Sequence, residues 1–499
     1  MAKNKISKNL VVGVGSRLLI IAMGIIMPRL IMVNLGSEAN GLLSTVGQIY
    51  AYIALLEAGI GNATLNALYS PLANDDRLLA SSIVSSSLKA FRKSAILYAG
   101  CVVALAIILP FVLSTTIDKT TIAIIVLLQG ASNVANYVFA AAYKQLLIAD
   151  GENYIIENTQ LIVHVGTTLG KIIVICLGGD IIVLQLINVA IALLGVAIIS
   201  VVVKKKYSWL KKSSECKPYT LQDRRGFVIH EVAGTIFSCT DLICISCFVG
   251  MASASVYAVY NLVYSSLNTL ISTVVSGTSY ILGKTYHKCQ SLFVAIYDTY
   301  DRFYCCLVFS IMTVACALTL PFVGLYTSGV TDVDYIDQYL PYLFAAVAVL
   351  SASRAAASKA ITVAGHVEQT KNRAIIEAGI NLVASIVLVN IIGIYGVLIG
   401  TIVALLYRVV DMNIYVNRKI LQRSCVKSFL FIGCSFVLSY VEIELLKHQA
   451  AYVDDYIKFI LAGIVGLLLI SAINFVLTAL LNLKNIIIIK KSLNMLTGN

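Results

Sequence analysis

Apolar runs follow one another along the whole chain, separated by short polar segments. Each run is about 20 residues long and holds few or no charges, which is the length that an α-helix needs to cross the hydrocarbon core of a bilayer. The pattern predicts an all-α polytopic membrane protein with about fourteen transmembrane helices. We place them near residues 9–33, 40–68, 94–113, 121–143, 155–177, 181–203, 227–248, 255–282, 303–325, 341–363, 374–393, 396–417, 428–446 and 459–483.

Lysine and arginine occur mainly in every second connection between the predicted helices, as the positive-inside rule requires of cytoplasmic segments. The basic segments are the N-terminus, the stretches near residues 77–93, 204–226, 284–288, 371–373 and 418–419, and the C-terminal tail. We therefore expect both termini on the cytoplasmic side. The net charge of +12 then reflects topology and contact with anionic membrane lipids, and it does not indicate nucleic-acid binding.

Composition leaves little room for a soluble catalytic domain, because 59% of the 499 residues are hydrophobic and 12% are charged. The first apolar run is full length and lacks a small-residue cleavage site, so we expect it to remain as a membrane anchor. Cys244 and Cys247 have CxxC spacing without a second ligand pair, which favours buried thiols over a metal site. The sequence holds no GxxxxGK[ST] motif, and we expect no cofactor.

A weak internal repeat appears when the chain is aligned with itself at an offset of 214 residues. Gly36 then aligns with Gly250, and Gly151 aligns with Gly365. The repeat spans six helices, an even number, so both halves keep the same orientation in the membrane. This predicts two six-helix lobes in a parallel pseudo-repeat. The expected divisions are an N-lobe at 1–203, a cytoplasmic linker at 204–226, a C-lobe at 227–420, and an additional helix pair with a cytoplasmic tail at 421–499.

Polar residues recur at steps of three and four inside several predicted helices, which places them on one helix face. They include Gln129, Asn133 and Lys144 in and just after 121–143, and His164 and Lys171 in 155–177. Unsatisfied polar groups are costly in hydrocarbon, so such stripes face either neighbouring helices or a water-filled cavity. For His164, a hydrogen-bonded interior position stays open as the alternative to a functional role.

Charged side chains inside the predicted helices are the strongest functional candidates, because a charge at the bilayer centre costs about 3 kcal/mol or more. The cationic candidates are Arg17, Lys171, Arg354 and Lys359. The acidic candidates, for ion coupling or a gate, are Glu57, Asp241 and Glu231.

Two charge relations follow from spacing alone. Arg17 and Glu231 are 214 residues apart and so occupy equivalent depths in the two lobes, where they either meet as a cytoplasmic-side gate or face their own lobes. Arg408 and Asp411 are one helical turn apart, so they either neutralise each other or take part in transport.

Three short segments carry a family resemblance. The segments LGSEANGL at 35–42 and LLEAGIGNA at 55–63 resemble the first helical hairpin of Wzx-like polysaccharide flippases, and YKQLLIADGENY at 143–154 resembles the connection between helices 4 and 5 of those proteins. The family belongs to the multidrug/oligosaccharidyl-lipid/polysaccharide exporter superfamily.

The resemblance implies two six-helix lobes around a central cavity that opens alternately to the two sides of a bacterial cytoplasmic (inner) membrane. The transported molecule would be an undecaprenyl-pyrophosphate-linked oligosaccharide for surface polysaccharide biosynthesis. Cations in the cavity would receive its pyrophosphate, a role that falls here to Arg17, Lys171, Arg354 and Lys359. The implied partners are this lipid-linked oligosaccharide, membrane lipids, H⁺ or Na⁺ as coupling ion, and the polysaccharide polymerase machinery.

Two other functions stay open. A cation-coupled multidrug exporter of the same superfamily would share the fold, but its cavity would favour acidic and aromatic residues over the four cations above. A membrane polysaccharide polymerase or glycosyltransferase would need sizeable external loops, whereas the largest outer connections here, near 326–340 and 447–458, are short. The pattern therefore favours a transporter over an enzyme.

Overall fold

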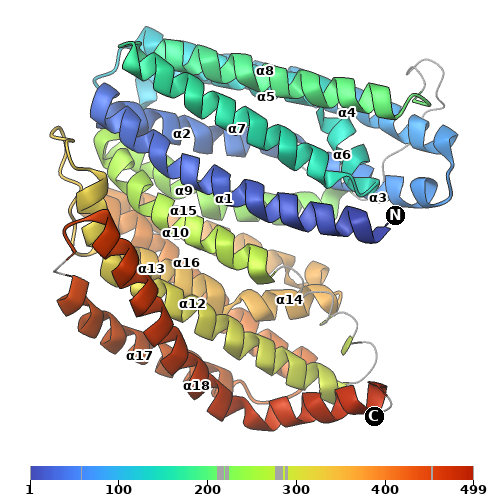
Figure 1. Ribbon diagram of the computed structural model, residues 1–499, viewed down its shortest axis with the longest axis vertical. Helices are drawn as coiled ribbons and strands as arrows, with labels where there is room; N and C mark the ends of the chain where they lie inside the picture. Colours follow the sequence, from blue (N-terminus) through green and yellow to red (C-terminus); the bar gives the residue numbers. More distant parts are fainter. Residues whose placement is uncertain are drawn as a thin grey trace. The chain divides into compact units, whose positions relative to one another are not determined.

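The computed structural model describes residues 2–57, 59–210, 219, 224–275, 282, 285–286, 290–450 and 453–497 (Figure 1). Within these residues the chain forms helices and no strands. Ten of the described helices are long and apolar enough to cross a membrane, and Leu19–Leu35 and Gly234–Phe248 are shorter apolar helices. The predicted all-α polytopic membrane protein is confirmed, and each predicted membrane-spanning range overlaps a described helix.

The chain divides into two compact units, Met1–Ser255 and Val256–Asn499. The first unit contains α1 (Ala2–Leu35), α2 (Ser37–Ala54), the 3₁₀ turn η1 (Leu55–Glu57), α3 (Ile60–Ala73), α4 (Arg77–Val112), α5 (Lys119–Phe139), α6 (Ala141–Ala149), α7 (Asn153–Cys176), α8 (Ile181–Lys206) and α9 (Arg224–Phe248). Helix α9 belongs to this unit because it packs against α2 and α3. The predicted lobe boundary at 204–226 stays a prediction.

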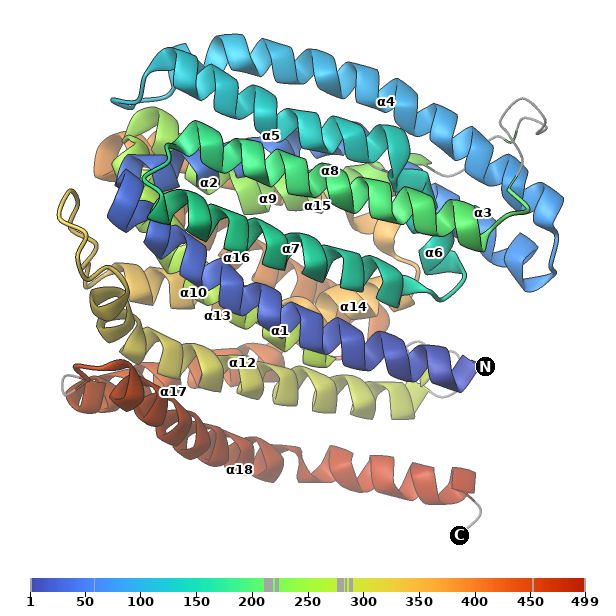
Figure 2. The same cartoon turned by 45° about the horizontal axis from the view of Figure 1, so that its top comes forward.

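The second unit contains most of α10 (Met251–Val275), then α12 (Gln290–Tyr326), α13 (Leu340–Ser353), α14 (Ala355–Val363), α15 (Val367–Ile392), α16 (Ile394–Tyr415), the π-helical turn η3 (Val416–Ile420), α17 (Val426–Ala450) and α18 (Tyr456–Thr497). In both views α12 lies beside α18 (Figure 2). The most apolar part of α12 is 67% buried, against 17% for α18. Helix α12 is therefore central in this unit, and α18 turns most of its surface toward lipid.

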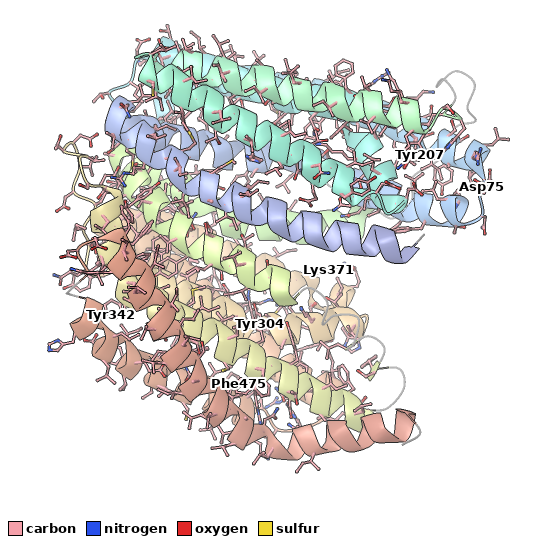
Figure 3. All side chains as sticks on the ribbon, in the orientation of Figure 1. Asp75, Tyr207, Tyr304, Tyr342, Lys371 and Phe475 are labelled. Carbon is pink, nitrogen blue, oxygen red and sulfur yellow. The ribbon has the colours of Figure 1, made fainter. Side chains whose placement is uncertain are left out.

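Side chains fill the spaces between these helices (Figure 3). Phe475 of α18 packs on Phe303 of α12 with the ring centroids 5.1 Å apart. On its other faces α18 exposes large apolar residues such as Leu468 and Leu481. Because lipid is as apolar as leucine, exposure of this kind is what a membrane-facing helix requires.

Three predicted membrane helices are interrupted, which corrects the prediction that they are continuous. The run 40–68 forms α2, η1 and α3, the run 121–143 is broken between α5 and α6, and the run 341–363 is broken between α13 and α14. The first break ends at Gly59, whose φ of +81° is a left-handed conformation that favours glycine. The other two fall at Ala140 and Arg354, where hydropathy gives no sign of them. Broken helices are tolerated inside a membrane where protein covers the freed backbone groups.

The 214-residue offset recurs in the backbone. Helix α2 begins at Ser37 and α10 at Met251, and α7 begins at Asn153 and α15 at Val367; in both pairs the starting numbers differ by 214. The breaks at residues 140 and 354 are separated by the same interval.

The glycines that revealed the repeat in the sequence have matching conformations. Gly36 and Gly250, which each precede a helix, have φ of +88° and +127°. Gly151 and Gly365 have φ of +72° and +73°. A side chain at these positions would be strained, so the repeat preserves glycine where the turn requires it.

Candidate functional site

A polar cluster lies beside the break in the second membrane helix of the first unit. Glu57, the last residue of η1, is within electrostatic range of Lys144 on α6 and of Tyr98 on α4. The Lys144 ammonium donates a hydrogen bond to Asn136 Oδ1 at 2.6 Å, and Asn133 Nδ2 donates to Tyr98 OH at 2.9 Å. The predicted residues Glu57, Asn133 and Lys144 are thus brought together.

Aromatic packing holds this cluster in place. Tyr98 is 1% exposed, stacks on Tyr50 with the centroids 6.0 Å apart, and meets Tyr137 edge-on at 5.1 Å. Tyr50 donates to the carbonyl oxygen of Val126 on α5 at 2.5 Å. These contacts fix α2, α4 and α5 relative to one another. Gln129, also on α5, faces α2 at Gly47.

A second polar stripe runs along α7. His164 and Lys171, seven residues apart on the same helix face, are within electrostatic range of each other. His164 is exposed, whereas Lys171 is partly buried and forms no ion pair within the described part of the chain. Helix α1 packs against α7. The side chain of Arg17 on α1 lies outside the described residues.

The second unit contains a connected network of ion pairs. Arg354, at the break between α13 and α14, pairs with Glu377 of α15. The other oxygen of Glu377 lies 3.1 Å from Arg408 Nε on α16, and Arg408 Nη1 lies 3.1 Å from Asp411 Oδ2. Asp411 also pairs with Arg373 of α15. Counting only the residues that the structure describes, three arginines therefore share two carboxylates, a surplus of one positive charge.

Burial makes this network energetically important. The side chain of Arg408 is 4% exposed, and that of Glu377 is 9% exposed. The more accessible edge of the network holds Arg373 and Arg354, which are 39% and 22% exposed. The predicted pairing of Arg408 with Asp411 is confirmed, although each also has a second partner.

Lys359 of α14, five residues after Arg354, belongs to the same unit. Its ammonium lies 4.8 Å from the ring centroid of Tyr300 on α12, a cation–π arrangement. Lys359 therefore joins α14 to α12, and it is close in sequence to Arg354 of the ion-pair network.

A polar seam joins α2 to α9 and to the first turn of α10, all within the first unit. Three side-chain hydrogen bonds cross it: Asn40 to Ser255 at 2.8 Å, Thr45 to Ser246 at 2.5 Å, and Tyr52 to Thr240 at 2.5 Å. The helices approach so closely that a Cβ on Gly41 would lie 2.1 Å from the carbonyl oxygen of Met251. This is the close packing that small residues permit between membrane helices.

Of the two predicted acidic residues on α9, the structure describes the side chain of one. Asp241 is 5% exposed and lies within electrostatic range of Tyr52 and Cys244 beside the seam. The side chain of Glu231 lies outside the described residues, so the gate between Arg17 and Glu231 stays a prediction.

Sequence reasoning missed two members of these clusters. Tyr98 is a polar aromatic residue within a predicted apolar run, a signal that could have identified it. Arg373 was interpreted only as part of a basic cytoplasmic segment, whereas its guanidinium reaches Asp411 and lies 5.0 Å from the ring centroid of Tyr415.

The fold is similar to that of several solved membrane transporters. An inward-facing multidrug resistance MATE family transporter of the MOP superfamily matches with a TM-score of 0.65 and 12% identity, over 83% of this chain and 99% of that one. The lipid II flippase MurJ, in an inward closed conformation, matches with a TM-score of 0.67 and 14% identity, over 93% of this chain and 97% of that one. The chain has the fold of these transporters.

A third structure extends the comparison. A MOP superfamily transporter from Pyrococcus furiosus, described as having a binding pocket of reverse polarity, matches with a TM-score of 0.52 and 14% identity, over 84% of this chain and 96% of that one. No family model matches the sequence, and no curated protein matches it. The likeness to these transporters confirms the kind of fold that the sequence motifs implied, and the superfamily itself and the closer resemblance to polysaccharide flippases stay predictions.

Proposed function

We propose that this protein is a flippase that moves an undecaprenyl-pyrophosphate-linked oligosaccharide from the inner to the outer leaflet of the bacterial cytoplasmic membrane. The observation that carries the proposal is surplus positive charge within the membrane-embedded helices. Among the described residues, the network of the second unit has three arginines for two carboxylates, and Lys171 in the first unit has no ion-pair partner. Because charges in hydrocarbon are costly, an unneutralised cation there indicates a pathway for an anion.

The chemistry of the substrate fits this arrangement. A pyrophosphate linked to sugars needs a hydrated, cation-lined route, whereas its polyprenyl tail stays in lipid. Arg354 offers a guanidinium that is 22% exposed at the break between α13 and α14, and Lys171 offers the corresponding cation of the first unit. We assign Arg17 and Lys359 to the same role, contact with the pyrophosphate, because of their predicted depth in the membrane.

Alternating access supplies the mechanism. The seam between α2 and α9 is held by hydrogen bonds that exchange readily, and it carries no buried ion pair among the described residues. We assign α1–α8 to one lobe and the helices from α9 onward to the other. In the second conformation of the transport cycle, the two lobes separate at this seam. The protein then delivers repeat units to the polysaccharide polymerase machinery on the outer side.

A multidrug exporter is the second candidate function. The observation that favours it is the cluster of Glu57 with Tyr98 and Tyr50, because an acid among aromatic rings suits an organic cation. Lys144, which lies beside Glu57, offsets that acid and weakens the case.

Reconstituted vesicles distinguish the two functions. With a fluorescent undecaprenyl-pyrophosphate oligosaccharide, we expect Lys171→Gln to lower the flipping rate about tenfold, because a charge-assisted hydrogen bond contributes roughly 1.5 to 3 kcal/mol. Lys171→Arg should retain most activity, and the exposed Lys93→Gln on α4 serves as the control with the same charge loss. Wild-type rates in both Lys171→Gln and Arg354→Gln, or transport of a cationic drug in place of the oligosaccharide, would contradict the proposal.

Ion coupling is assigned to Glu57. A membrane-embedded carboxylate can bind a proton or Na⁺ in response to the side that it faces, and Glu57 sits at a helix break, with Asp241 as the second choice. We expect Glu57→Gln, which mimics the protonated acid, to bind substrate but to lose its response to an imposed H⁺ or Na⁺ gradient. The measurement is the flipping rate in vesicles with and without the gradient. An unchanged gradient response would assign Glu57 to structure, as the partner of Lys144.

A further inference from the structure

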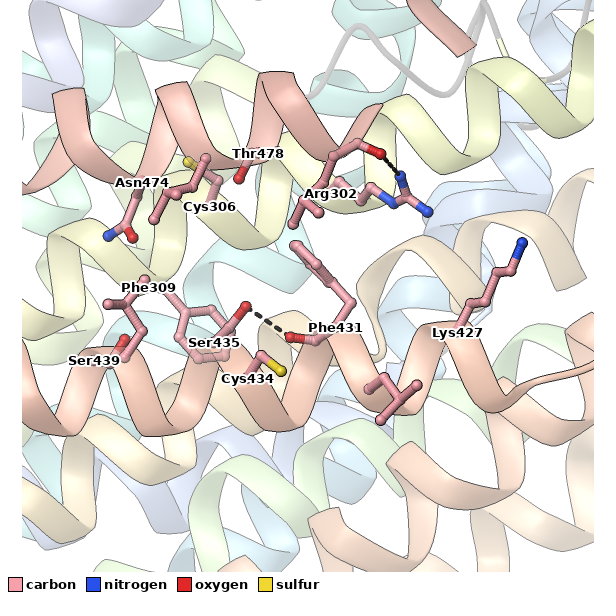
Figure 4. A pocket seen from close by; sticks show the side chains of 14 residues that line it. Arg302, Cys306, Phe309, Lys427, Phe431, Cys434, Ser435, Ser439, Asn474 and Thr478 are labelled. Atoms are coloured by element: carbon pink, nitrogen blue, oxygen red, sulfur yellow. Dashed lines mark hydrogen bonds between the residues drawn. The ribbon is translucent and has the colours of Figure 1, made fainter. Parts of the chain in front are cut away.

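A pocket lies among α12, α17 and α18, lined by none of the residues of the clusters described above (Figure 4). Its volume is about 390 Å³. Most of its wall is apolar, formed by Phe309 of α12, Leu430, Phe431 and Leu438 of α17, and Leu477 and Leu481 of α18. Leu430 and Leu481 are 62% and 68% exposed, so the pocket communicates with the lipid phase around the two outer helices.

Two cations stand together at one end of this pocket. Arg302 of α12 and Lys427 of α17 lie at the same end, whereas Asn474 and Ser439 lie at the other (Figure 4). Arg302 Nη1 donates to the carbonyl oxygen of Leu481 at 2.8 Å and to Asn482 Oδ1 at 3.1 Å, which holds the guanidinium at the pocket mouth. Neither cation forms an ion pair within the described part of the chain, and the remaining N–H groups of Arg302 are available to an oxygen ligand.

The charged side chains around this end of the pocket carry a net positive charge. Asp301 lies within electrostatic range of Arg302, and Asp298 pairs with Arg423 at 2.7 Å. Among the described residues here, Arg302, Lys427 and Arg423 outnumber Asp298 and Asp301 by one positive charge. An anionic headgroup complements this mouth, and a zwitterionic one complements it less well.

Apolar side chains line most of the pocket, and two of its polar side chains are already bonded to protein. Asn474 Nδ2 donates to Ser310 Oγ at 3.1 Å and lies 3.3 Å from Glu442 Oε2, and Ser435 Oγ donates to the carbonyl oxygen of Phe431 at 2.9 Å. The interior therefore offers little to a sugar or other polar body. It suits a hydrocarbon chain.

We propose that this pocket binds an anionic phospholipid of the bilayer, with its phosphate between Arg302 and Lys427 and one acyl chain between α17 and α18. Basic pockets between membrane helices bind anionic headgroups in this way. The volume lies at the low end of the range for small-ligand sites and holds part of one chain, while the other chain stays in the bilayer. The bound lipid would join the outer helix pair to α12.

The test measures lipid binding by the purified full-length protein in detergent, independently of transport. Native mass spectrometry and thermal unfolding are followed during titration with phosphatidylglycerol or phosphatidylcholine. We expect phosphatidylglycerol to bind preferentially and to raise the unfolding temperature. The double variant Arg302→Gln, Lys427→Gln should lose about 30-fold in apparent affinity for phosphatidylglycerol, because each basic side chain near an anionic headgroup contributes roughly a factor of five.

Two further variants make the result decisive. Arg92→Gln with Lys93→Gln removes two exposed cations from α4 and should leave the preference unchanged. Cys434→Trp fills the pocket while keeping both cations, and it should abolish retention of the lipid. Equal binding of both lipids, or an equal loss in the α4 variant, would overturn the proposal. Displacement of phosphatidylglycerol by a polyprenyl phosphate at comparable concentration would also overturn it, by assigning the pocket to the substrate's own tail.

Discussion

Oxidation of a protein carrying Thr45→Cys and Ser246→Cys is expected to reduce transport to background, and reduction is expected to restore it. The two native hydroxyl oxygens lie 2.5 Å apart across the seam between α2 and α9, a separation that brings the replacing thiols within disulfide geometry. If the proposed lobes part at this seam in each transport cycle, a covalent bond there holds the protein in one state. The background protein should lack Cys244 and Cys247, which are near Ser246 on α9.

The matched control crosslinks two helices that the proposed cycle does not separate. Thr64 of α3 and Ser87 of α4 are hydrogen bonded at 2.8 Å within the first unit. Oxidation of Thr64→Cys with Ser87→Cys should form a bond with equal ease and leave transport in place. The flipping rate in vesicles and the crosslinked fraction on a gel are measured on the same samples. Full transport by a completely crosslinked seam would show that α2 and α9 stay together throughout the cycle.

Substitution of Glu377 by Ala is expected to lower the free energy of unfolding by about 3–5 kcal/mol, the cost of leaving a buried ion pair without one partner. Glu377 pairs with both Arg354 and Arg408, and the Arg408 side chain is 4% exposed. Without Glu377, Arg408 keeps only Asp411, which it shares with Arg373. The surplus positive charge of the network would rise from one to two within the membrane-embedded part of the second unit.

Denaturant unfolding of the purified protein in detergent provides the measurement. Glu368→Ala is the control, because Glu368 is 71% exposed and its pair with Lys371 is of the surface kind that contributes up to about 1 kcal/mol. Glu377→Gln keeps one hydrogen-bonding oxygen, so its loss of unfolding free energy should lie between those of Glu377→Ala and Glu368→Ala. A loss below 1 kcal/mol in Glu377→Ala would mean that lipid headgroups or water neutralise the arginines.

The sequence alone determined the membrane class, the positions of the helices and the internal offset. These properties depend on the length and composition of each run, since every backbone polar group in lipid must be satisfied within the helix itself. The offset of 214 was visible from glycines such as Gly151 and Gly365, because a left-handed turn restricts the residue type at its own position. The cations inside predicted helices were likewise visible as breaks in an apolar pattern.

The tertiary structure decided which of those charges meet. Arg354, Glu377 and Arg408 come from three helices, and their pairing depends on how the faces of those helices turn toward one another. Hydropathy also did not predict the breaks at Ala140 and Arg354, because neither residue restricts its own backbone. Glu57, Tyr98 and Lys144 lie 41 and 46 residues apart in sequence and meet only because three separate helices pack around one break. Such contacts are set by packing over long sequence separations, which the local periodicity of a chain does not encode.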